Sequence, residues 1–364
     1  MNSDPERGTA PEFDELDRRV VHALQLDARA SFTRIAGVLG VSDQTVARRY
    51  TRLRSAGRLR VVALPSVRAL GESWWTVRLE CVPGAAEDLA RALAHRADTL
   101  WVSLVSAGTE IAFAVRGGEG GTPLLDRLPR TRQVVRMTAH CHLHTFFGGP
   151  LSLVNKLGAL TEAEVAELRW PVPDGPESDP VPASTLTEED RRLVAPLTRD
   201  GRASVTELAA ATGWSQTSVR RRLAELRAGD ALFFDIEYDW RVFGLAARAA
   251  LWLSVAPARL AETGEALAGH PEVAFCAATT GTSNLFAVAV CADIRALYTY
   301  LTTRIAALPA VRHMETAPLT RVAKGVAPPD GSAGARPRSA GAGGAVRAGG
   351  SAPGRSGGPV GGRR

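Results

Sequence analysis

Two segments of this chain carry basic, hydroxyl and amide side chains at the spacing of one exposed helix face. Four arginines stand against one acidic residue in Ser42–Arg54 and again in Ser215–Arg227, so each segment has a net charge of +3. Arginine can grip guanine or hold phosphate, glutamine suits adenine, and serine or threonine at a positive helix end can meet the DNA backbone. The pattern predicts contacts to double-stranded DNA through Ser42, Gln44, Thr45, Arg48, Arg49, Arg52, Ser215, Gln216, Thr217, Ser218, Arg220, Arg221 and Arg222.

Apolar residues define the opposite face of each predicted helix. They are Val46, Tyr50 and Leu53 in the first segment and Val219, Leu223 and Leu226 in the second. A solvated face on a small helical bundle is the plainer interpretation of an arginine-rich helix. DNA binding is favoured because helix cap, glycine turn, apolar stripe and basic face occur together, and occur twice.

The two segments are parts of a longer internal repeat. Asp17–Leu59 aligns with Asp190–Leu232 without gaps at a constant shift of 173, and 19 of the 43 positions are identical. Each copy predicts three helices and a short strand. The expected N-caps are Asp14, Ser31 and Ser42 in the first copy and Thr187, Ser204 and Ser215 in the second. Gly40 and Gly213 are expected to end the middle helices, and Pro196 should kink or shorten the helix that contains it.

A second pattern follows each copy of the three-helix unit. Strands are expected near 75–82, 100–106, 111–116 and 134–146, with helices near 85–94 and 123–128. The later copy predicts strands near 247–255, 273–279, 285–291 and 311–322, with helices near 258–268 and 294–308. This β-α-β-β-α-β order is ferredoxin-like. The shift of 173 persists at Gly108/Gly281 and Phe113/Phe286, so the whole two-domain unit is duplicated.

The predicted fold class is α+β, with two winged-type helix-turn-helix domains and two ferredoxin-like domains. Their expected ranges are 13–64 and 187–238 for the helix-turn-helix domains, and 65–149 and 239–324 for the ferredoxin-like domains. A leader (1–12), a proline-rich linker (150–186) and a disordered basic tail (325–364) complete the chain. The tail holds five of the six net positive charges, so the DNA argument rests on the local clusters.

These motifs resemble those of the Lrp/AsnC (feast/famine) family of bacterial transcriptional regulators, in a tandem-duplicated form. The resemblance rests on Leu16-Asp17, Leu24, Asp27 and Arg29, on Gly40, Ser42, Val46, Arg48 and Arg49, and on their counterparts in the second copy. It covers residues 13–324 apart from the linker. It implies a DNA-binding regulator whose ferredoxin-like domains dimerise and bind an amino acid or related small effector.

The resemblance also implies an effector loop and a pseudo-dimer. Gly281, Thr282, Ser283 and Asn284 match the family's loop, with Asn284 in place of its carboxylate, and the first copy has no polar residue there. A tight strand connection is the alternative interpretation of this loop. The two halves are expected to pair within one chain, and further homo-oligomers remain open. Because the recognition segments differ at Asp43/Gln216, Thr45/Ser218 and Ala47/Arg220, an operator with two unlike half-sites is expected.

Two other functions are compatible with these motifs. Siroheme decarboxylases resemble this family in fold and also occur as two-unit chains, and a chromosome-organising protein with little sequence preference would show similar basic helices. No G-x-S-x-G, P-loop or dinucleotide motif occurs, so no enzyme activity and no cofactor is expected.

Histidine and tryptophan side chains cluster outside the repeat motifs. His140, His142 and His144 share one face of a predicted strand, with Cys141 on the other face. They lack a partner pair at a familiar zinc spacing, so an interface or solvated edge is expected and no metal site. Four tryptophans lie in predicted strands: Trp74, Trp75, Trp101 and Trp252. We expect them in the core or on the dimer surface, and an effector-binding cage is the alternative interpretation.

The compartment is inferred from what the sequence does not contain. The start of the chain has no secretory signal pattern, no stretch is long and apolar enough to span a bilayer, and the four cysteines form no C-x-x-C pair. We expect a cytoplasmic protein without a membrane partner.

Overall fold

The computed structural model describes residues 13–118, 122–148, 153–170 and 186–325. The first half contains α1 (Glu15–Leu26), α2 (Phe32–Leu39), α3 (Asp43–Ser55), β1 (Leu59–Pro65), α4 (Val67–Leu70), β2 (Ser73–Cys81), α5 (Ala86–Ala94), β3 (Thr99–Val105), β4 (Glu110–Gly117), α6 (Pro123–Arg127), β5 (Val134–Phe147) and α7 (Glu162–Leu168). The second half contains α8 (Glu188–Leu197), α9 (Val205–Thr212), α10 (Gln216–Ala228), β6 (Leu232–Tyr238), β7 (Ala247–Val255), α11 (Leu260–Gly269), β8 (Val273–Thr279), β9 (Leu285–Cys291), α12 (Ile294–Tyr300) and β10 (Val311–Val322).

The predicted caps start the helices of both helix-turn-helix units. Asp14 caps α1 in a capping box with Asp17, and Thr187 caps α8 in the same way with Asp190. α2 and α9 end at Gly40 and Gly213, whose φ angles of 67° and 75° lie in the left-handed region that glycine adopts without steric cost. These predictions are confirmed.

The copies differ in two details of the backbone. Pro196 lies one residue before the end of α8, which has 10 residues where α1 has 12, as expected for a residue that cannot donate a helical hydrogen bond. Gly57, after α3, has a φ of 64°, and its counterpart Asp230 has a φ of 52°. The second copy therefore holds a non-glycine residue in a conformation that costs roughly 1 kcal/mol.

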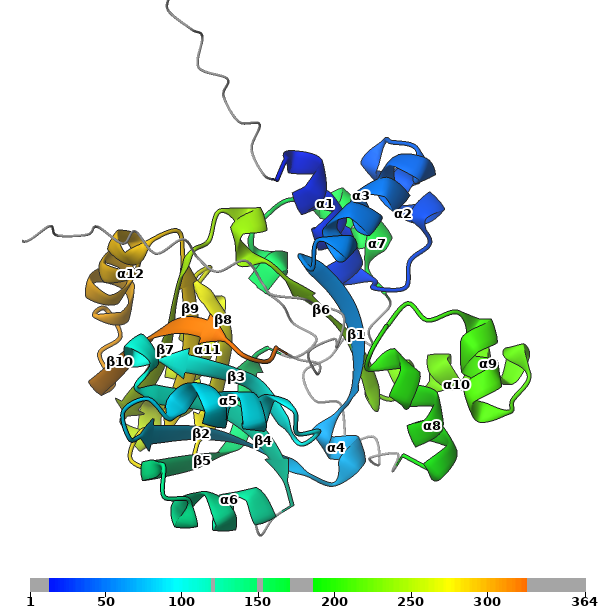
Figure 1. The fold of residues 1–364 in the computed structure, drawn as a ribbon. Coiled ribbons are helices and arrows are strands. Elements are labelled where there is room, and N and C mark those ends of the chain that lie inside the picture. Colours follow the sequence, from blue (N-terminus) through cyan, green and yellow to red (C-terminus); the bar gives the residue numbers. More distant parts are fainter. Residues whose placement is uncertain (1–12, 119–121, 149–152, 171–185, 326–364) are drawn as a thin grey trace, which may run out of the picture. The chain divides into compact units, whose positions relative to one another are not determined.

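The strand after each recognition helix pairs with its counterpart from the other copy. β1 and β6 form a two-stranded antiparallel sheet, in which Leu59 is opposite Tyr238 and Pro65 is opposite Leu232 (Figure 1). Val62 is opposite Asp235, and these two residues are themselves counterparts in the repeat. A local pseudo-twofold axis therefore passes between them, and neither strand forms a local hairpin of the kind that a wing would need.

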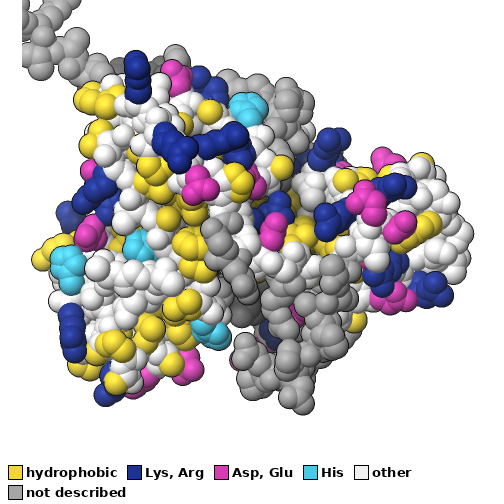
Figure 2. Space-filling view, turned by 90° about the horizontal axis from the view of Figure 1, so that it is seen from below, with side chains coloured by type: hydrophobic (Ala, Val, Ile, Leu, Met, Phe, Trp, Pro, Cys, Tyr) yellow, Lys and Arg dark blue, Asp and Glu magenta, His cyan; other side chains and the backbone are white. Residues whose placement is uncertain are grey.

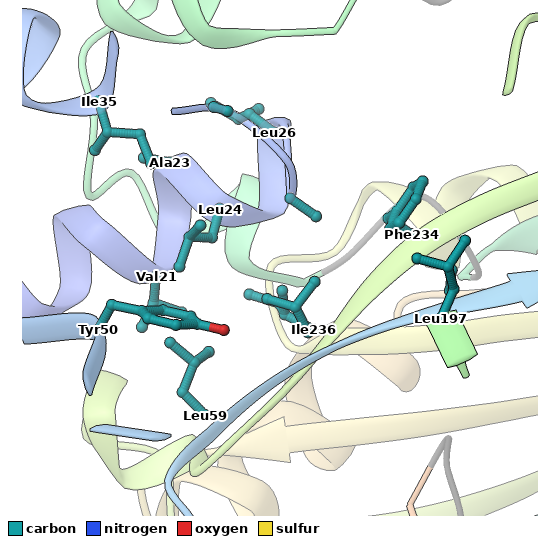
Figure 3. Close-up of a cluster of buried hydrophobic side chains, with 14 of the residues drawn as sticks. Val21, Ala23, Leu24, Leu26, Ile35, Tyr50, Leu59, Leu197, Phe234 and Ile236 are labelled. Carbon is teal, nitrogen blue, oxygen red and sulfur yellow. The ribbon is translucent and has the colours of Figure 1, made fainter. Parts of the chain in front are cut away.

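One hydrophobic core joins the two helix-turn-helix units. Val21, Leu24 and Leu59 of the first copy belong to the same buried cluster as Leu197 and Ile236 of the second (Figure 3). Part of the predicted linker contributes as well, because Val154, Leu160 and Leu168, at or near α7, are buried in this cluster. At roughly 25 cal/mol per Å² of buried apolar surface, such a shared core stabilises both units together.

The other eight strands close a barrel in the order β10-β3-β4-β2-β5-β8-β9-β7. Within each half the order is that of a ferredoxin-like sheet, and the last strand of each half crosses to the other, β5 to β8 and β10 to β3. α5 and α6 cover one half and α11 and α12 the other. Val105 and Ala112 meet Trp252 and Phe286 in a core between the halves. The halves thus form an intramolecular pseudo-dimer.

Candidate nucleic-acid interface

Serine hydroxyls set the start of both recognition helices, α3 and α10. Ser42 Oγ accepts a hydrogen bond from Thr45 N at 3.2 Å, and Ser215 Oγ accepts one from Ser218 N at 3.2 Å. Each serine hydroxyl also contacts the hydroxyl of Thr45 or Ser218, at 2.9 and 3.0 Å. Two of the predicted DNA contacts, Ser42 and Ser215, therefore serve as helix caps, while their exposed position at a positive helix end still suits a phosphate.

The apolar stripes predicted from the sequence face inward. Val46, Tyr50 and Leu53 of α3 are buried, as are Val219, Leu223 and Leu226 of α10. The opposite sides are exposed, with Gln44 and Arg48 on α3 and Gln216, Thr217, Arg220 and Arg221 on α10. Each helix thus turns a polar, basic face to solvent, as a helix that enters a major groove must do.

Three of the predicted arginines hold the recognition helix against the first helix of its unit. Arg49 pairs with Asp14 at 2.5 Å and with Asp17 at 3.2 Å, and Arg52 pairs with Asp17 at 2.5 Å. In the second copy both oxygens of Asp190 accept from Arg222 at 2.7 Å. This guanidinium holds the pKa of Asp190 below its ordinary value, mainly through that hydrogen bond.

The remaining arginines are exposed and nearly free. Within the described part of the chain, Arg48 makes no side-chain hydrogen bond or ion pair. Arg220 donates to Gln216 at 3.3 Å, and Arg221 lies 3.5 Å from Glu225 with 78% of its side chain exposed. Exposed pairs of this kind contribute little, so these guanidinium groups can exchange them for phosphate or base contacts.

The two reading faces differ in charge. α3 has Asp43 in its first turn and one free arginine, whereas α10 has no acid there and presents both Arg220 and Arg221. Arg52 of α3 also corresponds to Glu225 of α10. On the face of the molecule drawn in Figure 2, basic and acidic side chains lie beside one another rather than forming a continuous basic surface. The positive charge that suits DNA is local to the recognition helices, since Ser42–Arg54 and Ser215–Arg227 each carry a net +3.

The predicted effector loop is held by its own side chains. The side-chain oxygen of Asn284 accepts from Val255 N at 2.8 Å, and its amide nitrogen donates to Val255 O at 2.9 Å. Gly281 has a φ of 101°, and a Cβ there would lie 2.5 Å from Nδ1 of His140. Asn284 thus fastens the end of β7, while Gly281 and Thr282 are exposed.

The histidines of β5 lie where the two halves meet. His140 Nδ1 contacts the carbonyl oxygen of Thr280 at 2.6 Å, and His142 Nε2 contacts the hydroxyl of Thr76 at 2.7 Å. Burial lowers the pKa of His142 to about 4, so this ring is neutral at physiological pH. Among the described residues, no three histidine, cysteine or acidic side chains gather as metal ligands. The same part of the chain contains no helix both long and apolar enough to cross a membrane.

Comparison with known proteins identifies both helix-turn-helix units and the second ferredoxin-like domain. The AsnC-type helix-turn-helix domain matches residues 13–54 and 186–227, and the Lrp/AsnC ligand binding domain matches residues 248–325. The chain carries the domains of the Lrp/AsnC family. The two helix-turn-helix matches include both recognition helices of this tandem Lrp/AsnC protein, and the ligand-binding match covers β7 to β10.

Similar proteins match parts of the chain or its whole fold. An uncharacterized HTH-type transcriptional regulator of Pyrococcus abyssi is 29% identical over 140 residues, which are 38% of this chain and 89% of that protein. One of Pyrococcus furiosus is also 29% identical over 140 residues, covering 95% of its length. The crystal structure of the siroheme decarboxylase NirDL superposes with a TM-score of 0.56 at 18% identity, over 86% of this chain and 93% of NirDL. That likeness concerns the fold alone.

Proposed function

We propose that this tandem Lrp/AsnC protein is a transcriptional regulator that binds an operator of two unlike half-sites, one through α3 and one through α10. The exposed arginines of the two recognition helices carry the proposal. Arg48 acts beside Gln44 in one half-site, and Arg220 and Arg221 act beside Gln216 and Thr217 in the other. Arginine and glutamine read guanine and adenine in the major groove, and arginine also holds phosphate. Access to the chromosome would place the protein in the cytoplasm.

Selection of bound sequences from random DNA tests this function. We expect a bipartite motif with different left and right halves, because α3 and α10 differ at exposed counterpart positions such as Asp43/Gln216 and Gln44/Thr217. Affinity for the selected site should exceed that for unrelated DNA of equal length by about 1,000-fold at one fixed salt concentration. A strict palindrome protected equally on both arms would contradict two unlike half-sites. Equal affinity for both DNAs would favour a chromosome-organising protein.

A small-molecule effector is the second part of the proposal, and it rests on the ligand-binding match. The structure limits how the loop Gly281–Asn284 could take part. Because both polar atoms of the Asn284 side chain bind the backbone of Val255, an effector at this loop would meet Thr282, Ser283 and exposed backbone.

The fold shared with NirDL makes tetrapyrrole chemistry the rival function. We propose that the chain is not an enzyme, since His142 is committed to Thr76 and both recognition helices keep exposed arginines. The chain purified from cells, and the same chain mixed with iron uroporphyrin, should show no protein-bound tetrapyrrole absorption after gel filtration. A stoichiometric bound spectrum would favour the enzyme instead.

A further inference from the structure

The D-x-R-A-S motif, which occurs once in each copy, forms a turn with the same local chemistry both times. Asp27 Oδ1 accepts from the backbone of Arg29 at 3.2 Å, and Asp200 Oδ1 accepts from Arg202 at 2.9 Å. The serine that ends the motif caps the next helix, Ser31 for α2 and Ser204 for α9. The aspartate and serine thereby fix the turn, and the arginine between them is left to reach outward.

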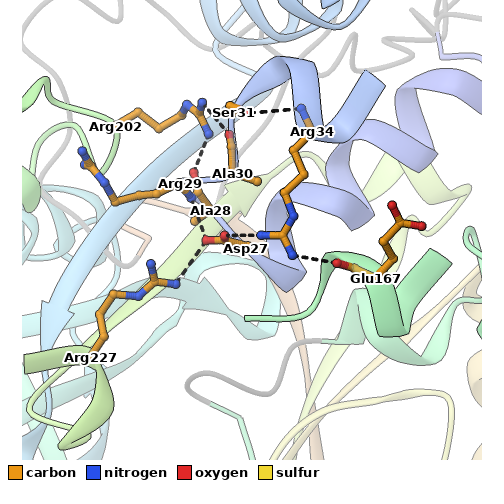
Figure 4. A network of polar contacts seen from close by, with 9 residues as sticks. All are labelled: Asp27, Ala28, Arg29, Ala30, Ser31, Arg34, Glu167, Arg202 and Arg227. Carbon is orange, nitrogen blue, oxygen red and sulfur yellow. Dashed lines mark hydrogen bonds and ion pairs between the residues drawn. The ribbon is translucent and has the colours of Figure 1, made fainter. Parts of the chain in front are cut away.

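Each of these arginines binds the turn of the other copy. Arg29 donates to the carbonyl oxygens of Gly201 and Ala203 at 2.6 and 3.0 Å. Arg202 donates to those of Ala28 and Ala30 at 2.6 and 2.9 Å (Figure 4). The two sets of contacts are exact counterparts under the repeat. A planar guanidinium can hold two carbonyls at once, which a lysine ammonium cannot do in the same fixed geometry.

The same turns hold the last turns of the recognition helices. Arg54 of α3 pairs with Asp200 at 2.7 Å, and Arg227 of α10 pairs with Asp27 at 3.1 Å (Figure 4). Asp27 is 4% exposed and also meets Arg34 at 3.4 Å. Each recognition helix is thereby attached, at its C-terminal end, to the other helix-turn-helix unit.

These contacts lie in a partly buried and closely packed place. Arg202 stands over the ring of Phe32 at 4.6 Å, and burial lowers the pKa of Arg29 and of Arg202. The turn of the second copy is pressed against β1, because Gly201 N donates to Val61 O at 2.8 Å and a Cβ on Gly201 would lie 2.8 Å from the Val61 side chain. Hydrogen bonds at such sites are costly to leave unmade, so the arrangement resists small displacements.

We propose that Arg29 and Arg202, together with Asp27 and Asp200, are positioning residues that fix the separation and mutual orientation of α3 and α10. The inference rests on the proposed function for its DNA consequence. Half-sites for paired recognition helices lie one helical turn of DNA, or a multiple, apart, so a fixed pair of helices accepts one spacing. Half-site spacing is then part of the protein's specificity, in addition to base sequence.

The geometry can be measured without DNA. Nitroxide labels at Asp43→Cys and Gln216→Cys, in full-length protein with Cys81→Ser and Cys141→Ser, mark counterpart exposed positions on the two recognition helices. Double electron–electron resonance should give a narrow distance distribution for this parent. We expect Arg29→Ala/Arg202→Ala to broaden it at least about twofold, since two bidentate links are lost. An equally narrow distribution in that variant would overturn the proposal.

Two further variants separate positioning from charge and from folding. Arg91→Ala/Arg259→Ala removes the same two charges from exposed ion pairs on α5 and beside α11, and should leave the distribution unchanged. Arg29→Lys/Arg202→Lys keeps the charges but loses the bidentate hydrogen bonds to two carbonyl oxygens. It should therefore broaden the distance distribution as well. If the alanine variant does not fold, as judged by circular dichroism, the lysine variant decides. A narrow distribution there would refute the positioning role.

DNA binding provides the second readout. Inserting half a helical turn, about 5 base pairs, between the selected half-sites should weaken binding of the unlabelled wild-type protein about 100-fold, and inserting a full turn should weaken it less. The Arg29→Ala/Arg202→Ala protein should lose only a few-fold on the same insertions. An identical spacing penalty in both proteins would contradict the inference. If the unlabelled wild-type protein shows no preference for any DNA, the proposed function fails, while the resonance result still decides the positioning role.

Discussion

Replacing Arg48 and Arg221 together with alanine should weaken operator binding about 100-fold, because two base or phosphate contacts are each worth roughly 1 to 3 kcal/mol. These two residues are repeat counterparts on the exposed faces of α3 and α10, and neither supports the fold. The melting temperature should therefore stay within about 1 °C of the parent's, since surface changes of this kind alter stability little. Fluorescence anisotropy with labelled operator measures the affinity.

The salt dependence and the single variants sharpen this test. If both arginines contact phosphate, the slope of log affinity against log salt concentration should fall by about 2 in the double variant. Arg91→Ala/Arg259→Ala serves as the control, because it removes the same number of positive charges from exposed ion pairs outside the helix-turn-helix units. Arg48→Ala alone should weaken protection of one half-site and Arg221→Ala that of the other. Unchanged affinity in the double variant would exclude these faces as the DNA contact.

Replacing Asp17 with alanine should lower the stability of the first helix-turn-helix unit by about 1.5 to 3 kcal/mol, because the hydrogen bonds of a buried carboxylate to two partly exposed arginines are lost. Asp17 is 0% exposed, receives Arg49 and Arg52, and accepts from Asp14 N at 3.1 Å in the capping box. Its loss leaves two guanidinium groups without their shared carboxylate and frees one end of α1. Hydrogen exchange of the α1 and α3 amides, together with urea unfolding, measures the change.

Two other aspartate-to-alanine variants provide comparisons for the loss of stability in Asp17→Ala. Asp190→Ala should cost less than Asp17→Ala, because only Arg222 loses its partner and Arg222 retains Glu225 at 3.0 Å. Asp88→Ala, which breaks a pair whose side chains are 65% and 82% exposed, should change stability by less than about 0.5 kcal/mol. A cost for Asp17→Ala no greater than that for Asp88→Ala would show that the cluster does not hold the recognition helix in place.

Local signals were enough to predict most of the secondary structure, although they did not predict α4. Capping boxes at Asp14, Thr187 and Ser204, and the left-handed glycines at Gly40 and Gly213, act over a few residues and are visible in one sequence. Strand pairing is different in kind. β1 meets β6, and β5 meets β8, across more than a hundred residues, and alternation of side chains does not specify which edge a strand will join.

The candidate site was predicted in composition but only partly in role. Helical spacing placed Arg48 and Arg49 together, yet one is exposed and the other is bound to Asp14 and Asp17. The available signal was the acidic residue three positions into α1, which serves both the cap and a neighbouring helix. The outward role of Arg29 and Arg202 had no local signal, because their partners are backbone carbonyls of the other copy.

The pair at the centre of the β1–β6 sheet shows what joining two copies in one chain permits. In a symmetric dimer, the residue on the twofold axis must face its own duplicate, so a buried aspartate at this place would meet a second aspartate. Here Asp235, whose pKa burial raises to about 7, faces Val62 instead. A homodimer of one gene product cannot place a valine opposite an aspartate on its twofold axis. A substitution in this chain changes one copy only, whereas in a homodimer it would change both subunits. The two copies can therefore evolve separately.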